Sequence, residues 1–561
     1  MGQYHLGLST SGHDPALAIV DETGRVVFAE STERFVQDKR AWGIAPDHVT
    51  HLESALAAIG FDPEKDSLQV ATSWKHVKAD VPLQLSNVLL PSSDGLWLRE
   101  LQSAAQSGAG ATLLRLGLAS VMPDIRRFDH HLCHAVSATV FAPASDAACL
   151  VIDGEGEVGA VSLFDLRDRR IKRRWRSWGP GSLGTFYAWL TTLCGFDWRL
   201  GEEWKVMGLA AFGHPKAELQ QTLASVLRVE NGRLRFADES VLTTAHETLR
   251  RFARAEGAPV LQAADLAASG QAVFADLTDQ ILTSCFEGAG GTLILSGGCA
   301  LNSSYNGTIV GRTGFDRVFV PPAPADDGNA IGAAVLSWMQ STGELRIPVS
   351  DGSAYLGSSP APKAVARLSH LRGLGRVRDI SGDSAGQIAR QLAAGKIIGV
   401  MRGRAEFGPR ALGNRSILAD PRGQDMKDRI NRDVKGREPY RPFAPVIADD
   451  KVSEWFERPQ PSPYMSVTLP WRVAARARVP AVVHEDGTGR LQTVSQTSAP
   501  WLHDLTKAFG SMTGVPIILN TSFNVMGKPI VHSVEDALAV FATSGLDSVL
   551  IDDHLIEKRD A

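Results

Sequence analysis

The stretch FDHHLCHAVSA, residues 128–138, contains three histidines and a cysteine. His130 and His134 are four residues apart, so on a helix they would lie on one face, one turn apart. Two imidazoles at this spacing can bind one metal ion, as in HExxH helices, although the glutamate of that motif is missing here. The alternative is a purely structural helix start. His131 and Cys133 point to other faces, where we expect them to pack or to support the site.

Two acidic positions elsewhere in the chain could complete such a site. Asp153 ends a predicted strand at a glycine-rich turn, and Asp326 opens a predicted helix after a proline-rich loop. Two histidines with one or two carboxylates suit a divalent ion such as Fe(II), Mn(II) or Zn(II). The sequence therefore predicts a metal site whose ligands are His130, His134, Asp153 and Asp326, without choosing the metal.

A second group of charged residues lies in the C-terminal part of the chain. Lys435, Arg437 and Arg441 alternate with prolines, which fix the backbone around them. Fixed cations favour a phosphate or carboxylate ligand, and arginine offers a planar fork of donors. The alternative is ordinary solvated surface charge. The further cations and hydrogen-bond donors that we assign to this anion site are Arg410, Arg415, Arg490, Asn520, Ser522 and Asn524.

Repeated strand–turn–strand patterns are predicted to position these groups. Residues 5–11, 16–20 and 26–30 have the composition of strands joined by polar turns, and residues 149–153 and 160–166 begin a second series. Two such halves, each followed by helices, are typical of actin-like and sugar-kinase-like nucleotide-binding folds. Backbone N–H groups in their tight turns can bind phosphate. Two unrelated hairpins are the alternative interpretation.

Helical spacing of apolar residues covers the segments 45–60, 97–120, 216–226 and 262–288. A later strand breaks at Gly297 and Gly298 before another helix, which is a plausible nucleotide pocket. The stretch 342–362 is rich in Gly, Pro and Ser and indicates a domain boundary. We therefore predict two α/β domains, residues 1–350 and 351–561.

The composition limits the classes of function. The chain has 561 residues, of which 44% are hydrophobic and 21% charged, as in ordinary globular proteins. A net charge of -4 argues against a protein that mainly wraps nucleic acid. We find no signal-peptide pattern and no apolar stretch of membrane-spanning length. The five cysteines form no CxxC pair, which argues against a zinc knuckle or a disulfide framework. We expect a cytoplasmic protein.

A series of motifs gives the chain a family resemblance. They are SGHDPA, DHHLCHA, VIDGEGE, GEEWKVMGLAAFG, LSGGCALN, ADDGNAIGAA, EFGPRALGNRSILADPR, VKGREPYRPFAP, DGTGRLQTV and LNTSFNVMGKPIV. With these motifs the chain resembles the carbamoyltransferase family that includes the nodulation-factor, cephamycin and tobramycin (nebramycin) carbamoyltransferases. The resemblance covers most of the length. It implies a duplicated actin-like (ASKHA) N-terminal domain followed by a YrdC-like α/β domain.

The resemblance implies two coupled sites in an ATP-dependent O-carbamoyltransferase. The YrdC-like domain would make carbamoyl adenylate from ATP, with Mg, and carbamoyl phosphate. Residues matched to this first site are Lys435, Arg441, Arg490, Ser522 and Asn524. The actin-like domain would hold iron(II) on the two histidines and two aspartates and pass the carbamoyl group to a small-molecule hydroxyl. Residues that we assign to the adenylate there are Lys205, Gly297, Gly298 and Asn302.

An acceptor hydroxyl needs a general base, and His13 beside Asp14 in the first turn is the candidate, with Asp14 orienting the ring. The alternative is that His13 only caps the turn. A hydrogenase-maturation carbamoyltransferase would normally carry CxxC zinc motifs, and a tRNA threonylcarbamoyl transferase would need a basic surface. A non-catalytic ATP-binding regulator would need neither Lys435 nor Arg441. The resemblance also hints at a homodimer. From the net charge and the missing membrane-spanning stretch we expect no nucleic-acid or membrane partner.

Overall fold

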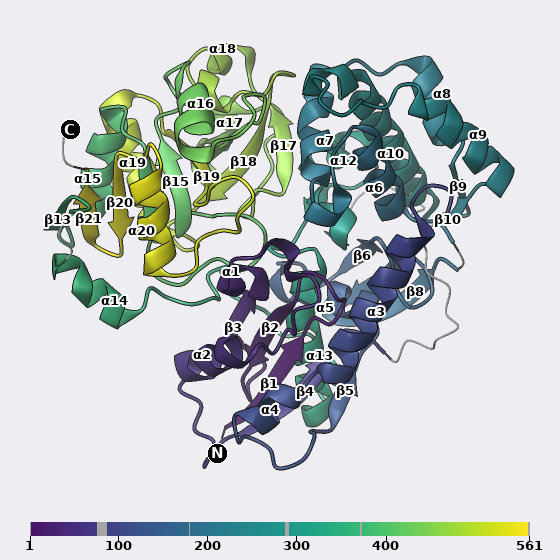
Figure 1. Cartoon of the computed structure of the whole chain (residues 1–561), viewed down its shortest axis with the longest axis horizontal. Helices are drawn as coiled ribbons and strands as arrows, with labels where there is room; N and C mark the ends of the chain where they lie inside the picture. Colours follow the sequence, from purple (N-terminus) through teal and green to yellow (C-terminus); the bar gives the residue numbers. More distant parts are fainter. Residues whose placement is uncertain (1, 76–86, 179, 286–290, 371–372, 559–561) are drawn as a thin grey trace. The chain divides into compact units, whose positions relative to one another are not determined.

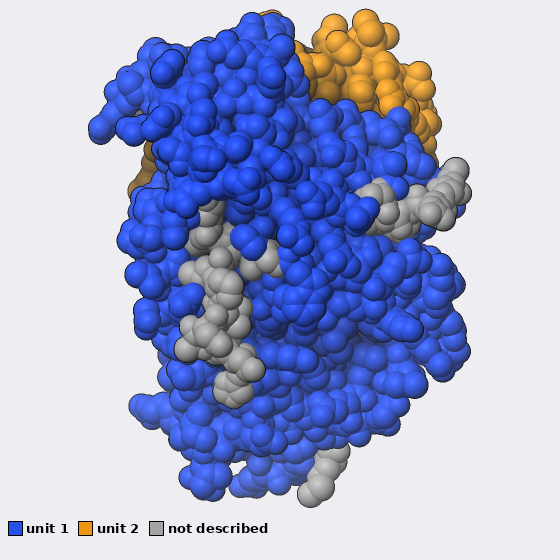
Figure 2. Space-filling view, turned by 90° about the vertical axis from the view of Figure 1, so that its right-hand side faces the viewer, with its two compact units in different colours: residues 1–33, 40–352 blue, residues 34–39, 353–561 orange. Residues whose placement is uncertain are grey.

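The chain divides into two compact units. The computed structural model describes residues 2–75, 87–178, 180–285, 291–370 and 373–558 (Figure 1). The first unit is formed by residues 1–33 and 40–352, and the second by residues 34–39 and 353–561 (Figure 2). The sequence did not indicate that the short segment 34–39 belongs with the C-terminal part of the chain.

The first unit contains two five-stranded sheets of identical topology. The strands of the first sheet are β1 (Gln3–Leu8), β2 (Ala16–Val20), β3 (Val26–Ser31), β4 (Ser67–Thr72) and β5 (Ile125–Arg127), in the order β3-β2-β1-β4-β5. The strands of the second are β6 (Ala147–Ile152), β7 (Val161–Arg167), β8 (Arg170–Arg176), β11 (Thr292–Ser296) and β12 (Arg317–Phe319), in the order β8-β7-β6-β11-β12.

The strand directions repeat as well. In each sheet the first three strands pair antiparallel, and the fourth and fifth join parallel to the first. The predicted internal repeat is therefore real, and this duplicated mixed sheet is the arrangement of the actin-like fold. The prediction of an α/β, actin-like fold class is confirmed for the N-terminal part of the chain.

One helix follows the last strand of each sheet, and these two helices pack tightly against each other. They are α5 (His130–Phe141) and α13 (Asn329–Thr342) (Figure 1). A Cβ atom at Gly332 would overlap the carbonyl oxygen of Cys133, and one at Gly7 would overlap that of Ala330. Small residues thus let α13 lie directly against α5 and β1. This contact places the start of α13 beside the histidine-bearing end of α5.

The other helices of this unit depart from the predictions mainly at their ends. The predicted helix 97–120 is two helices, because Gly110 has a left-handed φ of 82° between α3 (Ser92–Gly108) and α4 (Ala111–Arg115). The remaining ones are α2 (Val49–Ile59), α6 (Leu183–Leu193), α7 (Glu203–Leu209), α8 (Ala217–Ala224), α9 (Glu239–Arg250), α10 (Ala264–Cys285), α11 (Ser303–Asn306) and α12 (Ile309–Arg312). The short helix α1 (Thr32–Val36) begins in the first unit and ends in the segment 34–39 of the second. In the part of the chain that the structure describes, no helix combines the length and apolar character needed to cross a membrane.

The second unit is built on a nine-stranded mixed sheet in the order β13-β21-β20-β14-β15-β19-β16-β18-β17. Its strands are β13 (Arg376–Asp379), β14 (Ile398–Met401), β15 (Arg415–Ala419), β16 (Ala444–Ala448), β17 (Val467–Pro470), β18 (Thr488–Val494), β19 (Ile517–Ser522), β20 (Ser548–Ile551) and β21 (His554–Glu557). The helices of the unit are α14 (Pro362–Arg367), α15 (Ser384–Ala393), α16 (Met426–Arg429), α17 (Val452–Trp455), α18 (Val473–Arg476), α19 (Pro500–Thr513) and α20 (Val534–Thr543).

Both faces of this sheet are covered by apolar cores. Ile517 belongs to one cluster and its neighbour Ile518 to the other, as the alternation of side chains along a strand requires. The cluster containing Ile518 includes Phe509 of α19, whereas the opposite cluster includes Phe541 of α20. The second unit is therefore an α/β layer structure with its own core, and its likeness to the YrdC fold stays a prediction.

Candidate functional sites

Helix α5 presents its two histidines from a firmly held N-terminus. Asp129 caps the helix by accepting a 3.0 Å hydrogen bond from the backbone N–H of Leu132, and it forms ion pairs with Arg173 and Arg176 of β8. His130 and His134 are each 1% exposed, and their Nε2 atoms lie 3.3 Å apart. The spacing of four residues thus brings both imidazoles to one point, as the sequence predicts.

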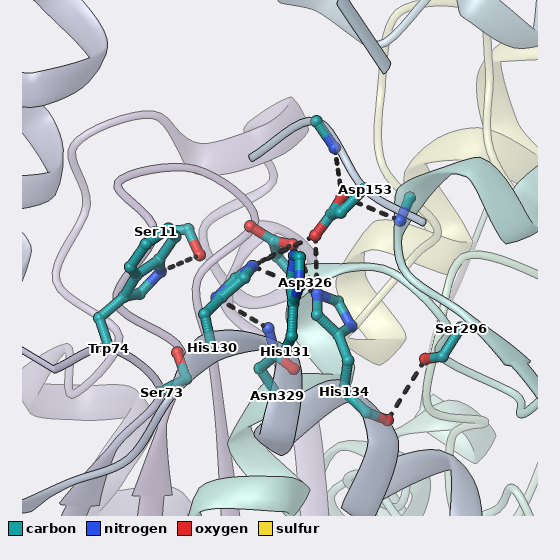
Figure 3. Close-up of polar contacts among 12 residues, drawn as sticks. Ser11, Ser73, Trp74, His130, His131, His134, Asp153, Ser296, Asp326 and Asn329 are labelled. Carbon is teal, nitrogen blue, oxygen red and sulfur yellow. Dashed lines mark hydrogen bonds and ion pairs between the residues drawn. The ribbon is translucent and has the colours of Figure 1, made fainter. Parts of the chain in front are cut away.

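Two carboxylates from distant parts of the chain reach the same point (Figure 3). Asp153 follows β6 and places Oδ2 2.8 Å from His134 Nε2 and 3.2 Å from His130 Nε2. Asp326 precedes α13 and places Oδ1 3.3 Å and 3.6 Å from the same two atoms. Ligand atoms of the four residues all lie within 4.8 Å of one another. The structure therefore brings the four predicted metal ligands together.

Neighbouring groups orient these side chains. The Oδ1 atom of Asp153 accepts hydrogen bonds from the backbone N–H groups of Gly154, at 2.8 Å, and Gly298, at 3.0 Å, which leaves Oδ2 to face the histidines. Trp74 stacks on the His130 ring with 4.1 Å between centroids, and Glu157 accepts the backbone N–H of His130 at 2.8 Å. Sequence reasoning missed Trp74, Glu157 and the contact of Gly298 with Asp153. The assignment of Gly298 to the adenylate stays a prediction.

The electrostatics of the cluster fit a divalent cation. Burial lowers the pKa of His130, but the charge of Asp326 and hydrogen bonds to both aspartates outweigh it and raise that pKa well above its usual range. The pKa of His134 is raised in the same way, mainly by Asp153. Burial opposes ionisation of Asp326, yet the two histidines hold its pKa well below the usual range. Two ionised carboxylates and two imidazole nitrogens form a suitable donor set for Fe(II), Mn(II) or Zn(II).

His13 lies at the edge of this cluster. Its Nε2 is 3.7 Å from Asp326 Oδ2, and its Nδ1 is 2.9 Å from Asp14 Oδ2. Arg40 also donates to Asp14 Oδ2, at 2.8 Å. Burial raises the pKa of Asp14, but Arg40 and His13 outweigh it and bring that pKa to about 2. The predicted pairing of His13 with an ionised Asp14 is present, whereas Arg40 was not anticipated because it lies far from both in sequence.

Other residues assigned to an adenylate make contacts within the protein. The Nζ atom of Lys205 lies 2.5 Å from Glu202 Oε1. Asn302 caps α11 through the backbone N–H of Tyr305 and exchanges two hydrogen bonds with Gln271. Gly297 has a left-handed φ of 89°, and a Cβ there would overlap the carbonyl oxygen of Ile152. These contacts give Asn302 and Gly297 structural roles, and their binding roles stay predictions.

The second unit carries the predicted anion site. Lys435 ends a π-helical turn, Ile430–Lys435, and is 2% exposed. Its Nζ donates to Asn524 Oδ1 at 2.7 Å and to the Asn524 carbonyl at 3.0 Å, and it also contacts the carbonyl and hydroxyl oxygens of Ser522. Ser522 and Asn524, which the sequence placed at the same site, therefore hold the lysine in place.

Arg437 and Arg441 interact electrostatically with this lysine. Arg437 donates Nε to Asn431 Oδ1 at 2.7 Å and lies over the Phe443 ring. Arg441 pairs with Glu438 at 3.3 Å. Within the described residues, Arg437 Nη2 and Arg490 Nε are buried and have no hydrogen-bond partner. Buried donors of this kind are costly unless a ligand satisfies them.

The pKa shifts report the same excess of positive charge. Burial lowers the pKa of Lys435 well below its usual range, and the charges of Arg437 and Arg441 lower it further. Burial, with Arg441, brings the pKa of Arg437 to about 9. Burial also lowers the pKa of Arg490, helped by Arg410 and Arg437. A bound anion would relieve this repulsion.

Two further groups of the cluster were missed by sequence reasoning. Lys427 interacts electrostatically with Arg437, and His484 with Arg490. Burial is the main cause that lowers the pKa of His484 to about 4. His484 stands two residues before DGTGR, so its proximity to Arg490 in sequence was the available signal.

Arg415 and Asn520 serve the scaffold of this unit. The Arg415 guanidinium is fully buried and donates to the carbonyls of Ser358, at 2.8 Å, and Arg402, at 3.0 Å, among others. Asn520 donates to the carbonyl of Ala411 at 3.1 Å and to Gln492 Oε1 at 2.7 Å. These contacts give both residues a structural role, and their roles in anion binding stay predictions.

Comparison with known proteins shows relatives along nearly the whole chain. The Synechocystis protein sll1178 is 31% identical over 602 residues, covering 99% of this chain and 96% of that protein. Nodulation protein NolNO of Sinorhizobium fredii is 38% identical, covering 77% of this chain and 64% of the relative. The 3'-hydroxymethylcephem-O-carbamoyltransferase of Amycolatopsis lactamdurans is 31% identical, covering 77% of this chain and 80% of the relative. Among solved structures, full-length HypF in the phosphate- and nucleotide-bound form is 12% identical with a TM-score of 0.36, over 62% of this chain and 56% of that one.

Family models match both units. The model described as Carbamoyltransferase N-terminus matches residues 4–335, and the model described as Carbamoyltransferase C-terminus matches residues 389–558. Together they include the histidine–aspartate cluster and the buried cations. The family resemblance is confirmed: the chain belongs to the O-carbamoyltransferase family and is an enzyme that transfers carbamoyl groups.

Proposed function

We propose that the enzyme uses ATP to move the carbamoyl group of carbamoyl phosphate, through carbamoyl adenylate, to a hydroxyl group of a small-molecule acceptor. The observation that carries this proposal is the cluster of cations at Lys435: the lysine is buried, and Arg437 and Arg490 each have a buried nitrogen without a hydrogen-bond partner among the described residues. Carbamoyl phosphate and ATP with Mg are the anions that the family resemblance implies. A cytoplasmic location belongs to the same proposal.

The second unit would perform the adenylation. Carbamoyl phosphate loses phosphate to water and leaves carbamate, whose oxygen attacks the α-phosphorus of ATP as pyrophosphate departs with the bonding electrons. Lys435, held by Ser522 and Asn524, and Arg441 would neutralise the phosphate charge. The unsatisfied donors of Arg437 and Arg490 would receive further phosphate oxygens.

The first unit would perform the transfer. His130, His134, Asp153 and Asp326 would hold a divalent metal, iron(II) by resemblance, which when bound supplies Lewis acidity to a carbonyl or phosphoryl oxygen. His13 would accept the proton of the attacking hydroxyl as its oxygen bonds to the carbamoyl carbon and AMP leaves. The 2.9 Å contact with Asp14 keeps the His13 ring oriented for this role.

The test separates the two half-reactions. Purified enzyme is incubated with ATP and carbamoyl phosphate without acceptor, and pyrophosphate release is measured. Wild type and His130→Ala should both release pyrophosphate that depends on carbamoyl phosphate. Wild type alone should then add a carbamoyl mass increment to a hydroxyl compound in metabolite pools followed by mass spectrometry. Pyrophosphate release that ignores carbamoyl phosphate would refute the adenylate route.

A further inference from the structure

Asn329 makes an incomplete contact with the metal centre. It is the first residue of α13 and is 0% exposed. Its Nδ2 lies 3.2 Å from His130 Nδ1, whereas its Oδ1 is buried and has no hydrogen-bond partner among the residues that the structure describes (Figure 3). A buried amide oxygen without a donor is costly, so this arrangement calls for an explanation.

The contact conflicts with metal binding by His130. An amide N–H only donates, so it needs an acceptor at His130 Nδ1. A protonated ring offers none there, and a neutral ring offers one only when its hydrogen sits on Nε2. That Nε2 faces the two aspartates, with Asp153 Oδ2 at 3.2 Å. A metal ion bound at Nε2 requires the lone pair of that nitrogen. The neutral ring offers this lone pair only when its hydrogen is on Nδ1.

A rotation of the Asn329 amide resolves both problems. Turning the amide by about 180° exchanges Nδ2 and Oδ1, which are nearly equal in size. Oδ1 then accepts from His130 Nδ1–H and gains the donor that it lacks. The stack of Trp74 on the imidazole, with 25° between the ring planes, fixes the orientation of the ring itself. Only the amide has to turn.

We propose that Asn329 is a positioning residue for the metal centre: its amide oxygen holds the His130 hydrogen on Nδ1 and leaves Nε2 to bind a divalent ion. The inference rests on the proposed function, because it presupposes that the four-residue cluster binds metal. Asn329 is well placed for this role because it follows the ligand Asp326 by three residues, where the 3-10 turn Asp326–Gly328 passes into α13. Such hydrogen-bond partners of metal ligands typically contribute a factor of about 10–100 in metal affinity.

The test measures metal affinity directly. Zn(II) is titrated at constant pH against a chromophoric chelator, with wild type, Asn329→Leu and Asn329→Asp. Leucine has a similar size and cannot accept a hydrogen bond, so its dissociation constant should rise about 10–100-fold. Aspartate accepts and does not donate, so Asn329→Asp should bind close to wild type. Asn306→Leu is the matched control. Asn306 is also 0% exposed, but its amide donates to the carbonyl of Ala300 instead of contacting His130.

Several results of this titration would contradict the proposed role of Asn329. The inference is wrong if folded Asn329→Leu binds Zn(II) as tightly as wild type, or if Asn306→Leu loses as much affinity. It is also wrong if Asn329→Asp loses tenfold or more, which keeps the test valid should the leucine variant not fold. Wild type binding no more tightly than His134→Ala would instead refute the metal site of the proposed function.

Discussion

The two sites contain buried ionised groups of opposite sign. In the first unit, Asp153 and Asp326 remain ionised although they are 7% and 6% exposed. In the second unit, Lys435, Arg437 and Arg490 are cations whose pKa values burial and like charges lower. A buried charge is stable only with a partner. In the first unit His130 and His134, whose pKa values are raised, are the partners of the two aspartates, and a divalent cation can take the place of their protons. The second site favours an anion.

We predict that Lys435→Met removes the adenylation activity. The side chain keeps its length and its apolar part, while the charge aimed at the phosphate is lost. Pyrophosphate release that depends on carbamoyl phosphate should fall by about 100-fold or more. Lys396→Met, at a half-exposed lysine of the same unit, is the control and should leave the rate unchanged. Equal rates for the two variants would show that Lys435 does not bind the reacting anion.

Residue types and spacing predicted part of the sites. The spacing of His130 and His134 was sufficient because helix geometry alone brings them together. Trp74 and Asn329, which contact His130, were missed. The neighbouring sequence does not distinguish a tryptophan or a helix-start asparagine in such a contact from one that only packs in the core. The hydrogen bonds of Arg415 to the carbonyls of Ser358 and Arg402 were not predictable, because only the folded loop brings these groups together. Contacts between residues that are distant in the sequence produce no periodic pattern from which they could be predicted.

At the scale of elements, the contact between α5 and α13 holds the proposed metal ligands together. Three of the four proposed ligands lie on α5 or just before α13, and Gly332 lets the two helices approach. The repeated strand pattern could be predicted from alternating apolar residues and polar turns. The break at Gly110 could not, because a glycine inside a helical pattern also fits a continuous helix.

Gly332→Ala should destabilise the first unit and weaken its metal site. The added methyl group collides with the backbone of Cys133, which cannot move without shifting α5 and its histidines. We expect a loss of about 1–3 kcal/mol in the free energy of unfolding, measured by urea denaturation. Gly108→Ala at the end of α3, where a Cβ meets nothing within 4 Å, should be neutral or slightly stabilising. The same cost for both variants would mean that close helix packing is not the cause.

The contact between β1 and α13 makes stability depend on pH. His5 is 0% exposed beside Ser337, and burial, with Arg126, lowers its pKa to about 4. The unfolded chain, with a pKa of about 6.5, binds the proton more readily, so stability falls as pH drops from 6.5 towards 4. This group should account for about 2 kcal/mol of the loss between pH 7 and pH 5.

Urea denaturation of His5→Gln at pH 7 and pH 5 measures that contribution. The loss of stability on acidification should be smaller in the variant than in wild type by the same amount. His214→Gln, at an exposed histidine, should keep the wild-type dependence on pH. An unchanged pH dependence in His5→Gln would show that His5 does not stay neutral in the folded state.

At the scale of the whole molecule, each unit has its own core and its own candidate ligand. The chain leaves the first unit after Glu33, contributes residues 34–39 to the second, and returns at Arg40. Within the second unit, Arg34 donates to the carbonyl of Glu406 at 2.6 Å, and Gln37 donates to that of Ile530 at 3.0 Å. The second unit thus needs a segment that a C-terminal fragment would lack. The composition predicted a domain boundary near residue 350, but not that residues 34–39 belong to the second unit.

Separate cores and separate ligands predict independent stabilisation in calorimetry of the full chain. Zn(II) should raise the midpoint of the transition that belongs to the first unit, and pyrophosphate that of the second. A ligand at 100 times its dissociation constant adds about 2.7 kcal/mol, which corresponds to several degrees for units of this size. His134→Ala should abolish the response to Zn(II) and keep the response to pyrophosphate, whereas Lys435→Met should do the reverse. If either variant lost both responses, the two ligands would share one site. The assignment of Zn(II) to the first unit and of pyrophosphate to the second would then be wrong.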